Sequence, residues 1–450
     1  MPDIKAATYR DKDVAEPPDA ASKPSLKRNF SATVVGNVLY AACQWAMLVA
    51  LAKMGNPVMV GKYVLGLAVT APIILAANLQ LASVQASDAR REYAFGHYLG
   101  LRLLTTILAL AVTGAVVAAS GYQRETALVV LIVAAMKACD AISDVMFGLL
   151  QQREQMLGIA AGLILNGVVS LAALVVALHV THNVVWAAAG SGLGSLMAAA
   201  YNLRSGARVL RAESASGGGP TSTRQLLAPR WEARRLQHLA ALALPLGVAM
   251  LLTTLSGCIP RYIIQHSLGE GELGIFGALA YVMTAGRTVI NAMGQAATPR
   301  MARHHAAGET AAFTHMLVRL FGFGAIIGAA GIAAAAAAGR GILSLLYTPE
   351  YAAATHVFTL MMVVAAIQYV VSFMGDGMTA ARLFKPQVPL CAGVSAATLI
   401  AGLVLIPRFG LTGAAWASII SVAVELIGRG GVLLFALARH TGATPAAASA

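Results

Sequence analysis

A stripe of polar side chains begins at Arg287, in the middle of a long apolar segment of the sequence. Asn291 and Gln295 follow at intervals of four residues, which places all three side chains on one face of a helix. A guanidinium offers forked donors that stay charged and suit phosphate oxygens, while the amides suit sugar hydroxyls. We therefore predict that the stripe binds a substrate. The alternative is that Arg287 forms a structural ion pair with a carboxylate of another helix.

Two further sets of residues are candidates for contact with the same substrate. Asn37, Tyr40 and Gln44 form an uncharged stripe in the first apolar segment, of which Asn37 and Gln44 are the predicted contacts. Polar residues also join membrane helices to one another, so this stripe has a purely structural alternative. Arg261 lies at the end of the seventh apolar segment, where it can receive a charged head group or extend its side chain to the membrane surface.

Lys137, Asp140 and Asp144 lie at i, i+3 and i+7 of the fourth apolar segment. One lysine cannot neutralise two carboxylates, so the second carboxylate is expected to be protonated in dry surroundings. The pattern predicts an ion-coupling site, and its alternative is a structural cluster that satisfies itself.

Other embedded charges have structural interpretations. Glu425 and Arg429 are spaced i, i+4 and predict an ion pair within one helix. Arg102 and Arg319 lie near the ends of their segments, so we expect both side chains to reach the membrane surface.

The sequence offers no catalytic or metal-binding motif. No pair of its four cysteines has the spacing of metal ligands, and no phosphate-binding glycine loop of the Walker type is present. The longest loop, 204–238, contains no aspartate that could serve glycosyl transfer. We therefore predict no enzyme activity, no catalytic residue, no metal and no cofactor.

The composition shows which elements must position these residues. Of 450 residues, 58% are hydrophobic and 11% are charged, which excludes an ordinary soluble enzyme. A helix crosses a membrane with about 20 apolar residues. Twelve such segments begin near residues 33, 59, 99, 126, 156, 184, 239, 273, 316, 354, 387 and 411. The prediction is an all-α polytopic membrane protein with about 12 transmembrane helices.

The net charge of +13 follows from how the loops are placed. When the loops are assigned alternately to two sides, one side holds most of the lysines and arginines. The positive-inside rule places that side, with both termini, in the cytoplasm of a multi-pass protein in the bacterial cell (inner) membrane. The basic charge is thereby explained as a signal of topology, and nucleic acid is not a predicted partner.

The basic, glycine- and serine-rich stretch between the sixth and seventh segments divides the chain into two halves. Weak echoes between the halves, such as 54–63 with 268–276, favour an internal duplication around a central cavity. The predicted divisions are a cytoplasmic N-terminal tail 1–29, a six-helix bundle 30–203, a flexible cytoplasmic linker 204–237, a second six-helix bundle 238–438 and a cytoplasmic C-terminal tail 439–450.

Four motifs resemble those of the polysaccharide transport family, the lipid-linked oligosaccharide or O-antigen type flippases of the multidrug/oligosaccharidyl-lipid/polysaccharide exporter superfamily. They are PRYIIQHSLGEGELGIFGALAYV from Pro260, PRMARHHAAGE from Pro299, LYTPEYAAA from Leu346 and FGLTGAAWAS from Phe409. The resemblance covers nearly the whole chain. It implies two six-helix bundles around a V-shaped cavity that opens to alternate sides. Members often have Asp before the Arg-Tyr pair where this chain has Pro260, which weakens the transfer of a role to Arg261.

The resemblance implies a flippase that moves polyprenyl-pyrophosphate-linked oligosaccharide repeat units from the cytoplasmic to the periplasmic leaflet by alternating access, for exopolysaccharide, capsule or O-antigen biosynthesis. Its partners would be this lipid-linked substrate, membrane lipids, a polysaccharide polymerase and other assembly proteins. A cation-coupled multidrug exporter of the same fold is the first alternative, and a membrane-embedded enzyme of polysaccharide biosynthesis is the second. Carboxylates in the cavity would favour the exporter, because they hold organic cations.

Overall fold

The computed structural model describes residues 26–88, 91–216, 222–383 and 386–442, and these ranges contain helices and connections but no strand. The helices of the first half are α1 (Leu26–Met54), α2 (Pro57–Ala77), α3 (Leu81–Ser87), α4 (Phe95–Ala119), α5 (Arg124–Gln152), α6 (Met156–Thr181) and α7 (Val184–Ser216). Those that follow are α8 (Thr223–Leu226), α9 (Ala233–Leu268), α10 (Glu270–Ala306), α11 (Thr310–Leu346), α12 (Pro349–Ala352), α13 (Thr355–Ala380) and α14 (Gln387–Gly442).

Eleven helices of the described part are long and apolar enough to cross a membrane. The last of them, α14, is a double span, because Gly410 interrupts it with a φ of 59°. This left-handed conformation is accessible to glycine at little cost, and Pro407 lies one turn earlier. The two segments of α14 therefore supply the eleventh and twelfth of the predicted spans, and the all-α membrane fold is confirmed.

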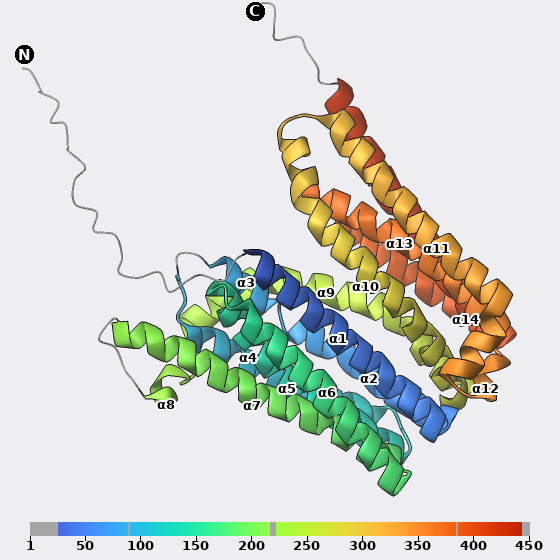
Figure 1. Ribbon diagram of the computed structural model, residues 1–450, viewed down its shortest axis with the longest axis horizontal. Coiled ribbons are helices and arrows are strands. Elements are labelled where there is room, and N and C mark those ends of the chain that lie inside the picture. Colours follow the sequence, from blue (N-terminus) through green and yellow to red (C-terminus); the bar gives the residue numbers. More distant parts are fainter. Residues whose placement is uncertain (1–25, 89–90, 217–221, 384–385, 443–450) are drawn as a thin grey trace, which may run out of the picture.

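The spanning helices form two bundles that meet at one end and diverge at the other (Figure 1). In the first bundle α6 packs between α1 and α7, and in the second α13 packs between α11 and α14. The bundles diverge at the end where α1 begins and α14 finishes, which we call the open end. They meet at the α1–α2 and α9–α10 turns, which mark the closed end.

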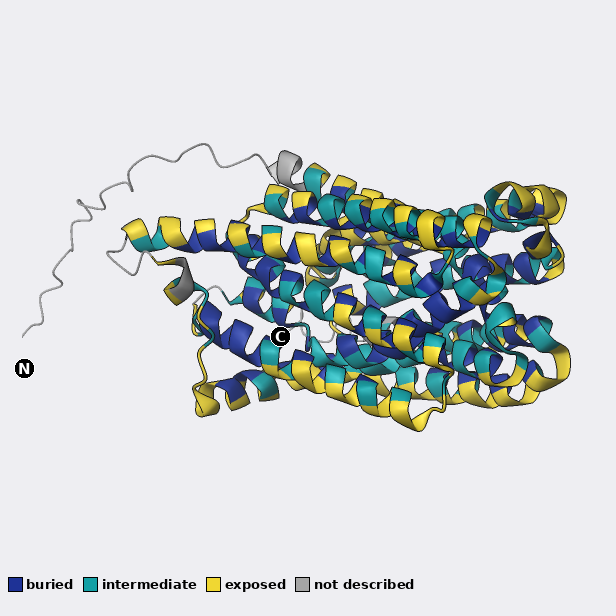
Figure 2. Cartoon of the chain, turned by 90° about the horizontal axis from the view of Figure 1, so that it is seen from below, coloured by how far each residue is buried: buried dark blue, intermediate teal, exposed yellow. Residues whose placement is uncertain are grey.

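Exposed residues lie mainly on the outer faces of the helices (Figure 2), and many of them are large and apolar. Val180, Ile326 and Ile427 each expose 70% or more of their surface. Such a surface is unfavourable in water and matches the hydrocarbon interior of a bilayer.

The interval between the bundles differs from the flexible linker that the composition predicts. Helix α7 continues to Ser216, so residues 204–216 are helical. Further along, the backbone N–H of Arg230 donates to the carbonyl oxygen of Gly96, 2.8 Å away, at the start of α4. Gly96 and Gly100 allow this approach, since a Cβ on either would collide with residues 228–230. Composition alone could not reveal this docking.

Helix α9 passes from one bundle to the other. Leu236, Leu239 and Ala243 belong to an apolar cluster built mainly from the first bundle. From residue 253 onward α9 also contacts α14, for example through the 2.5 Å bond between the hydroxyl groups of Ser256 and Ser395, while the Tyr262 hydroxyl still donates to the carbonyl oxygen of Ala68 on α2. The predicted second bundle, 238–438, therefore begins with residues that pack on the first.

Candidate functional site

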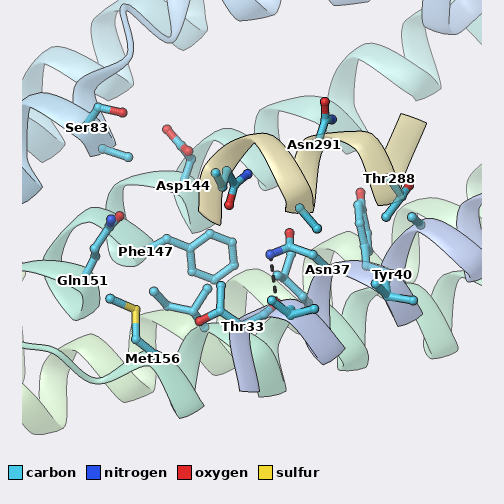
Figure 3. Close-up of a pocket in the computed structure, with 18 of the residues that line it drawn as sticks. Thr33, Asn37, Tyr40, Ser83, Asp144, Phe147, Gln151, Met156, Thr288 and Asn291 are labelled. Carbon is cyan, nitrogen blue, oxygen red and sulfur yellow. Dashed lines mark hydrogen bonds between the residues drawn. The ribbon is translucent and has the colours of Figure 1, made fainter. Parts of the chain in front are cut away.

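A cavity of about 1180 Å³ lies between the bundles in the half of the molecule nearer the open end. Residues of α1, α5, α6 and α10 and of the α2–α3 turn line it, and Figure 3 shows α1 and α10 on its walls. Its polar lining side chains are Thr33, Asn37, Tyr40, Gln80, Ser83, Asp144, Gln151, Glu154, Thr288, Asn291 and Gln295. The lining contains hydroxyls, amides and two carboxylates but no Lys or Arg.

Three of the predicted substrate contacts line this cavity: Asn37 on α1, and Asn291 and Gln295 on α10. The Asn37 amide donates a 2.9 Å bond to the carbonyl oxygen of Thr33, one turn earlier, which holds the side chain along its own helix (Figure 3). Asn291 and Gln295 are exposed on α10, and Thr288 lies on the same cavity wall. The four-residue spacing thus brings amides from both bundles to one space.

The other three predicted contacts lie outside the lining. Arg287 is exposed on the α10 face that carries Asn291, one turn nearer the closed end, and no carboxylate of the described residues lies within 4 Å of it. Gln44 donates a 2.8 Å bond to the Tyr40 hydroxyl. Arg261 is half-buried near the closed end of α9, with the sulfur of Cys258 4.0 Å away.

The three residues of the predicted ion-coupling group belong to two separate ion pairs. The amino group of Lys137 lies 3.0 Å from the carboxylate of Asp140, which also accepts a 2.9 Å bond from the Asn166 amide on α6. Asp144 instead pairs with Arg102 of α4 at 2.5 Å. The expectation of an unneutralised second carboxylate is therefore wrong. A coupling role for Lys137, Asp140 and Asp144 stays a prediction, now for a group whose charges balance.

Arg102 does not reach the membrane surface as expected, because its side chain is completely buried. It donates to Asp144 on α5 and to the Asn78 side-chain oxygen at the end of α2. The guanidinium therefore joins three helices behind the cavity wall. Arg319 is exposed, and its expected reach to the membrane surface stays a prediction.

Replacing Arg102 by methionine should destabilise the protein by about 3 kcal/mol, at the low end of the range for breaking a buried ion pair. The low end applies because 38% of the Asp144 side chain stays exposed and can be solvated. Thermal unfolding in detergent measures the change. Asp144→Asn leaves the completely buried Arg102 guanidinium with an acceptor but no counter-charge, so it should cost at least as much, and the double variant Arg102→Met/Asp144→Leu should recover part of the loss. An unchanged unfolding temperature for Arg102→Met would contradict this role.

An embedded carboxylate of the second bundle lacks such compensation among the described residues. Glu425 and Arg429 form the predicted i, i+4 pair at 2.6 Å, and Arg429 also donates to the carbonyl oxygen of Val371 at 3.3 Å. Asp376 of α13 has no ion-pair partner within 4 Å among the described residues. Its carboxylate faces α10 at Gly294, where a Cβ would overlap one of its oxygens. Asp376 thus lies directly behind the helix that carries Asn291 and Gln295.

Sequence patterns missed part of the lining. Gln80 lies in the irregular α2–α3 turn with a φ of 51°, and it accepts a 3.2 Å bond from the hydroxyl of Ser83 in the first turn of the short helix α3. Phe147 and Gln151 lie one and two turns beyond Asp144 on α5 (Figure 3). Their spacing with Asp144 is a helical signal that could have identified them. Among the described residues, no group of three or more His, Cys, Asp or Glu side chains could hold a metal ion.

The fold and the cavity define a polytopic, all-α membrane protein with two helical bundles, and the comparisons identify its family. Residues 26–305 match the model of the family described as polysaccharide biosynthesis protein. The chain belongs to this family. It is 25% identical over 419 residues to the capsular polysaccharide biosynthesis protein CapF of Staphylococcus aureus, and the match covers 89% of this chain and 98% of CapF.

Solved structures agree with the two-bundle architecture. An inward-facing multidrug resistance MATE family transporter of the MOP superfamily matches with a TM-score of 0.71 at 15% identity, over 93% of this chain and 100% of that one. The lipid II flippase MurJ, in an inward closed conformation, matches with a TM-score of 0.70 at 9% identity, over 91% and 89% of the two chains. At these identities the matches show a shared fold. The resemblance stated from the sequence motifs is confirmed.

Proposed function

We propose that the protein is a flippase that moves polyprenyl-pyrophosphate-linked oligosaccharide repeat units from the cytoplasmic to the periplasmic leaflet. The observation that carries the proposal is the cavity between the bundles, with Asn37 on one wall and Asn291 and Gln295 on another. Amides and hydroxyls form hydrogen bonds with sugar hydroxyls in either direction. A volume of about 1180 Å³ slightly exceeds the range of about 300–1,000 Å³ for small-ligand sites, which suits several sugar units.

The distribution of charge around the cavity supports different positions for the sugars and the pyrophosphate of the substrate. The lining offers amides, hydroxyls and two carboxylates, Asp144 and Glu154, of which Asp144 is paired with Arg102, and it contains no cation. It therefore suits the sugars and not the pyrophosphate. Arg287, one turn from Asn291, is the cation that supports a position for the pyrophosphate beside the sugar-binding space.

The direction of transport follows from the basic loops. The loops at the open end contain most of the lysines and arginines, so we propose that this end, with both termini, lies in the cytoplasm. The cavity then receives the substrate from the cytoplasmic leaflet, and alternating access of the two bundles releases it outside. A polysaccharide polymerase and other assembly proteins are the proposed partners downstream.

Replacing both Asn37 and Asn291 by alanine should lower the transport rate by about 5- to 150-fold, because each lost hydrogen bond to a sugar is worth about 0.5–1.5 kcal/mol and about 1.4 kcal/mol corresponds to a factor of ten. The measurement uses spheroplasts of a strain that lacks the gene, complemented with wild type or variant. An impermeant sugar label reports how much lipid-linked oligosaccharide reaches the outer leaflet.

Gln123→Ala is the matched control, since Gln123 is an exposed amide at the closed end, outside the cavity. It should transport like wild type. If complete repeat units reach the outer leaflet at a normal rate without the gene, and no second flippase is present, the proposed function fails. Export of organic cations would then be assayed next.

A further inference from the structure

The closed end is built from a reciprocal contact between α2 and α10. Pro57 and Gly61 are the first and fifth residues of α2, and Glu270 and Gly274 are the first and fifth of α10. A Cβ on Gly61 would overlap the carbonyl oxygen of Glu270, and a Cβ on Gly274 would overlap that of Pro57. The first residue of each helix therefore contacts the fifth residue of the other helix, as in an interface with a two-fold axis.

The axis of this contact passes between the eighth residues of the two helices. Val64 and Gly277 hold that position, and a Cβ on Gly277 would overlap the Val64 side chain. Val64 is 1% exposed. The helices approach so closely because residues 61, 274 and 277 are all glycine.

One ion pair crosses this contact among the described residues. The Lys62 amino group lies 2.5 Å from Glu125 of its own bundle and 3.9 Å from Glu270 of the other. The Thr126 hydroxyl donates a second bond to Glu270 at 2.5 Å. If α2 and α10 separate, Lys62 keeps Glu125, whereas Glu270 loses both Lys62 and Thr126. Separating the two helices therefore costs free energy mainly because the Glu270 carboxylate is left without its partners.

We propose that this contact is the outer gate of the transporter. Glu270 stabilises the closed state of the gate, and Gly61 and Gly274 allow the two helices to approach closely enough for the gate to close. The proposal rests on the alternating access proposed above. Any side chain at residue 61 or 274 would force the two helices apart, which would shift the protein toward the state open at this end. Loss of the Glu270 charge acts in the same direction, with a smaller effect, because the hydrogen bond from Thr126 can persist.

The experiment measures conformation rather than transport, so it can fail separately from the proposed function. Val64→Cys is introduced into a protein whose four native cysteines are replaced by alanine, and the purified protein is placed in nanodiscs. A bulky water-soluble maleimide then reports whether residue 64 is accessible. With the gate residues unchanged, labelling should be slow. Gly61→Val, Gly274→Val and Glu270→Gln should each raise the labelling rate, the two valine variants by at least tenfold.

Gly114→Val is the matched control, because a Cβ at this glycine of α4 meets no atom within 4 Å. It should leave the labelling rate unchanged. Glu270→Gln alters no packing, so it tests the gate even if a valine variant does not fold. Equal labelling rates for Glu270→Gln and its parent would contradict the proposal that Glu270 stabilises the closed gate. Rapid labelling of residue 64 with the gate residues unchanged would overturn the closed gate itself.

Discussion

Replacing Arg287 by leucine should reduce the proposed translocation of lipid-linked oligosaccharide by about 10- to 100-fold. A hydrogen bond to a charged group is worth about 1.5–3 kcal/mol, and about 1.4 kcal/mol corresponds to a factor of ten. Because no described carboxylate lies within 4 Å of Arg287, its loss breaks no ion pair, and the effect falls on the substrate. The outer-leaflet sugar label in complemented spheroplasts measures the rate.

Two further variants test whether the charge or the planar shape of the Arg287 guanidinium matters and whether the effect depends on its position. Arg287→Lys keeps the positive charge but not the planar fork, so its rate should lie between those of wild type and Arg287→Leu. Arg319→Leu removes an equally exposed arginine from α11, away from the cavity lining, and should be nearly neutral. Normal transport by Arg287→Leu, at equal abundance in the membrane, would assign the pyrophosphate to another residue.

The second large effect concerns the ion that drives the cycle. Asp376→Asn should reduce transport driven by a proton gradient at least tenfold, because Asp376 is the embedded carboxylate that the structure leaves without an ion-pair partner. An unpaired carboxylate in a membrane interior is expensive when charged, and taking up a proton removes that cost. Its position against Gly294 would transmit the change to α10. Reconstituted vesicles with an imposed pH gradient measure the effect.

Asp140→Asn distinguishes coupling from structure in the first bundle. Asp140 is already paired with Lys137 and held by Asn166, so its replacement should lower thermal stability by leaving the lysine uncompensated. The protein that remains folded should keep its response to the gradient. If Asp140→Asn instead abolishes that response while Asp376→Asn preserves it, the coupling site is the Lys137 group that the sequence indicates.

The spans could be predicted from the sequence because their signal is local. Length and apolar content fix a membrane crossing, and even the turn at Gly410 falls between two predicted segments. The position of Asn291 and Gln295 on the cavity wall was predictable for the same reason, since helical spacing is a local property. Gln80, in an irregular turn, has no such period and was missed.

Interactions between helices could not be predicted in this way. The expectation for Arg102 used its depth along one helix, whereas its environment is set by Asp144 on another. The docked residues near Arg230 likewise have the composition of a flexible segment, and only the contact with Gly96 shows their role. Periodicity identifies the face on which a residue lies, but the partner of that face depends on packing.

If the two bundles move against each other as proposed, the course of α9 means that the boundary between the moving bodies does not coincide with the division between the two halves of the chain. The helix starts in the apolar cluster of the first bundle, at Leu236 and Leu239, and finishes beside α14. When the bundles rock against each other, its first three turns travel with the half that precedes them. The change of angle must then be absorbed between about residues 247 and 253, so substitutions there would alter the rate of the cycle without contacting the cargo.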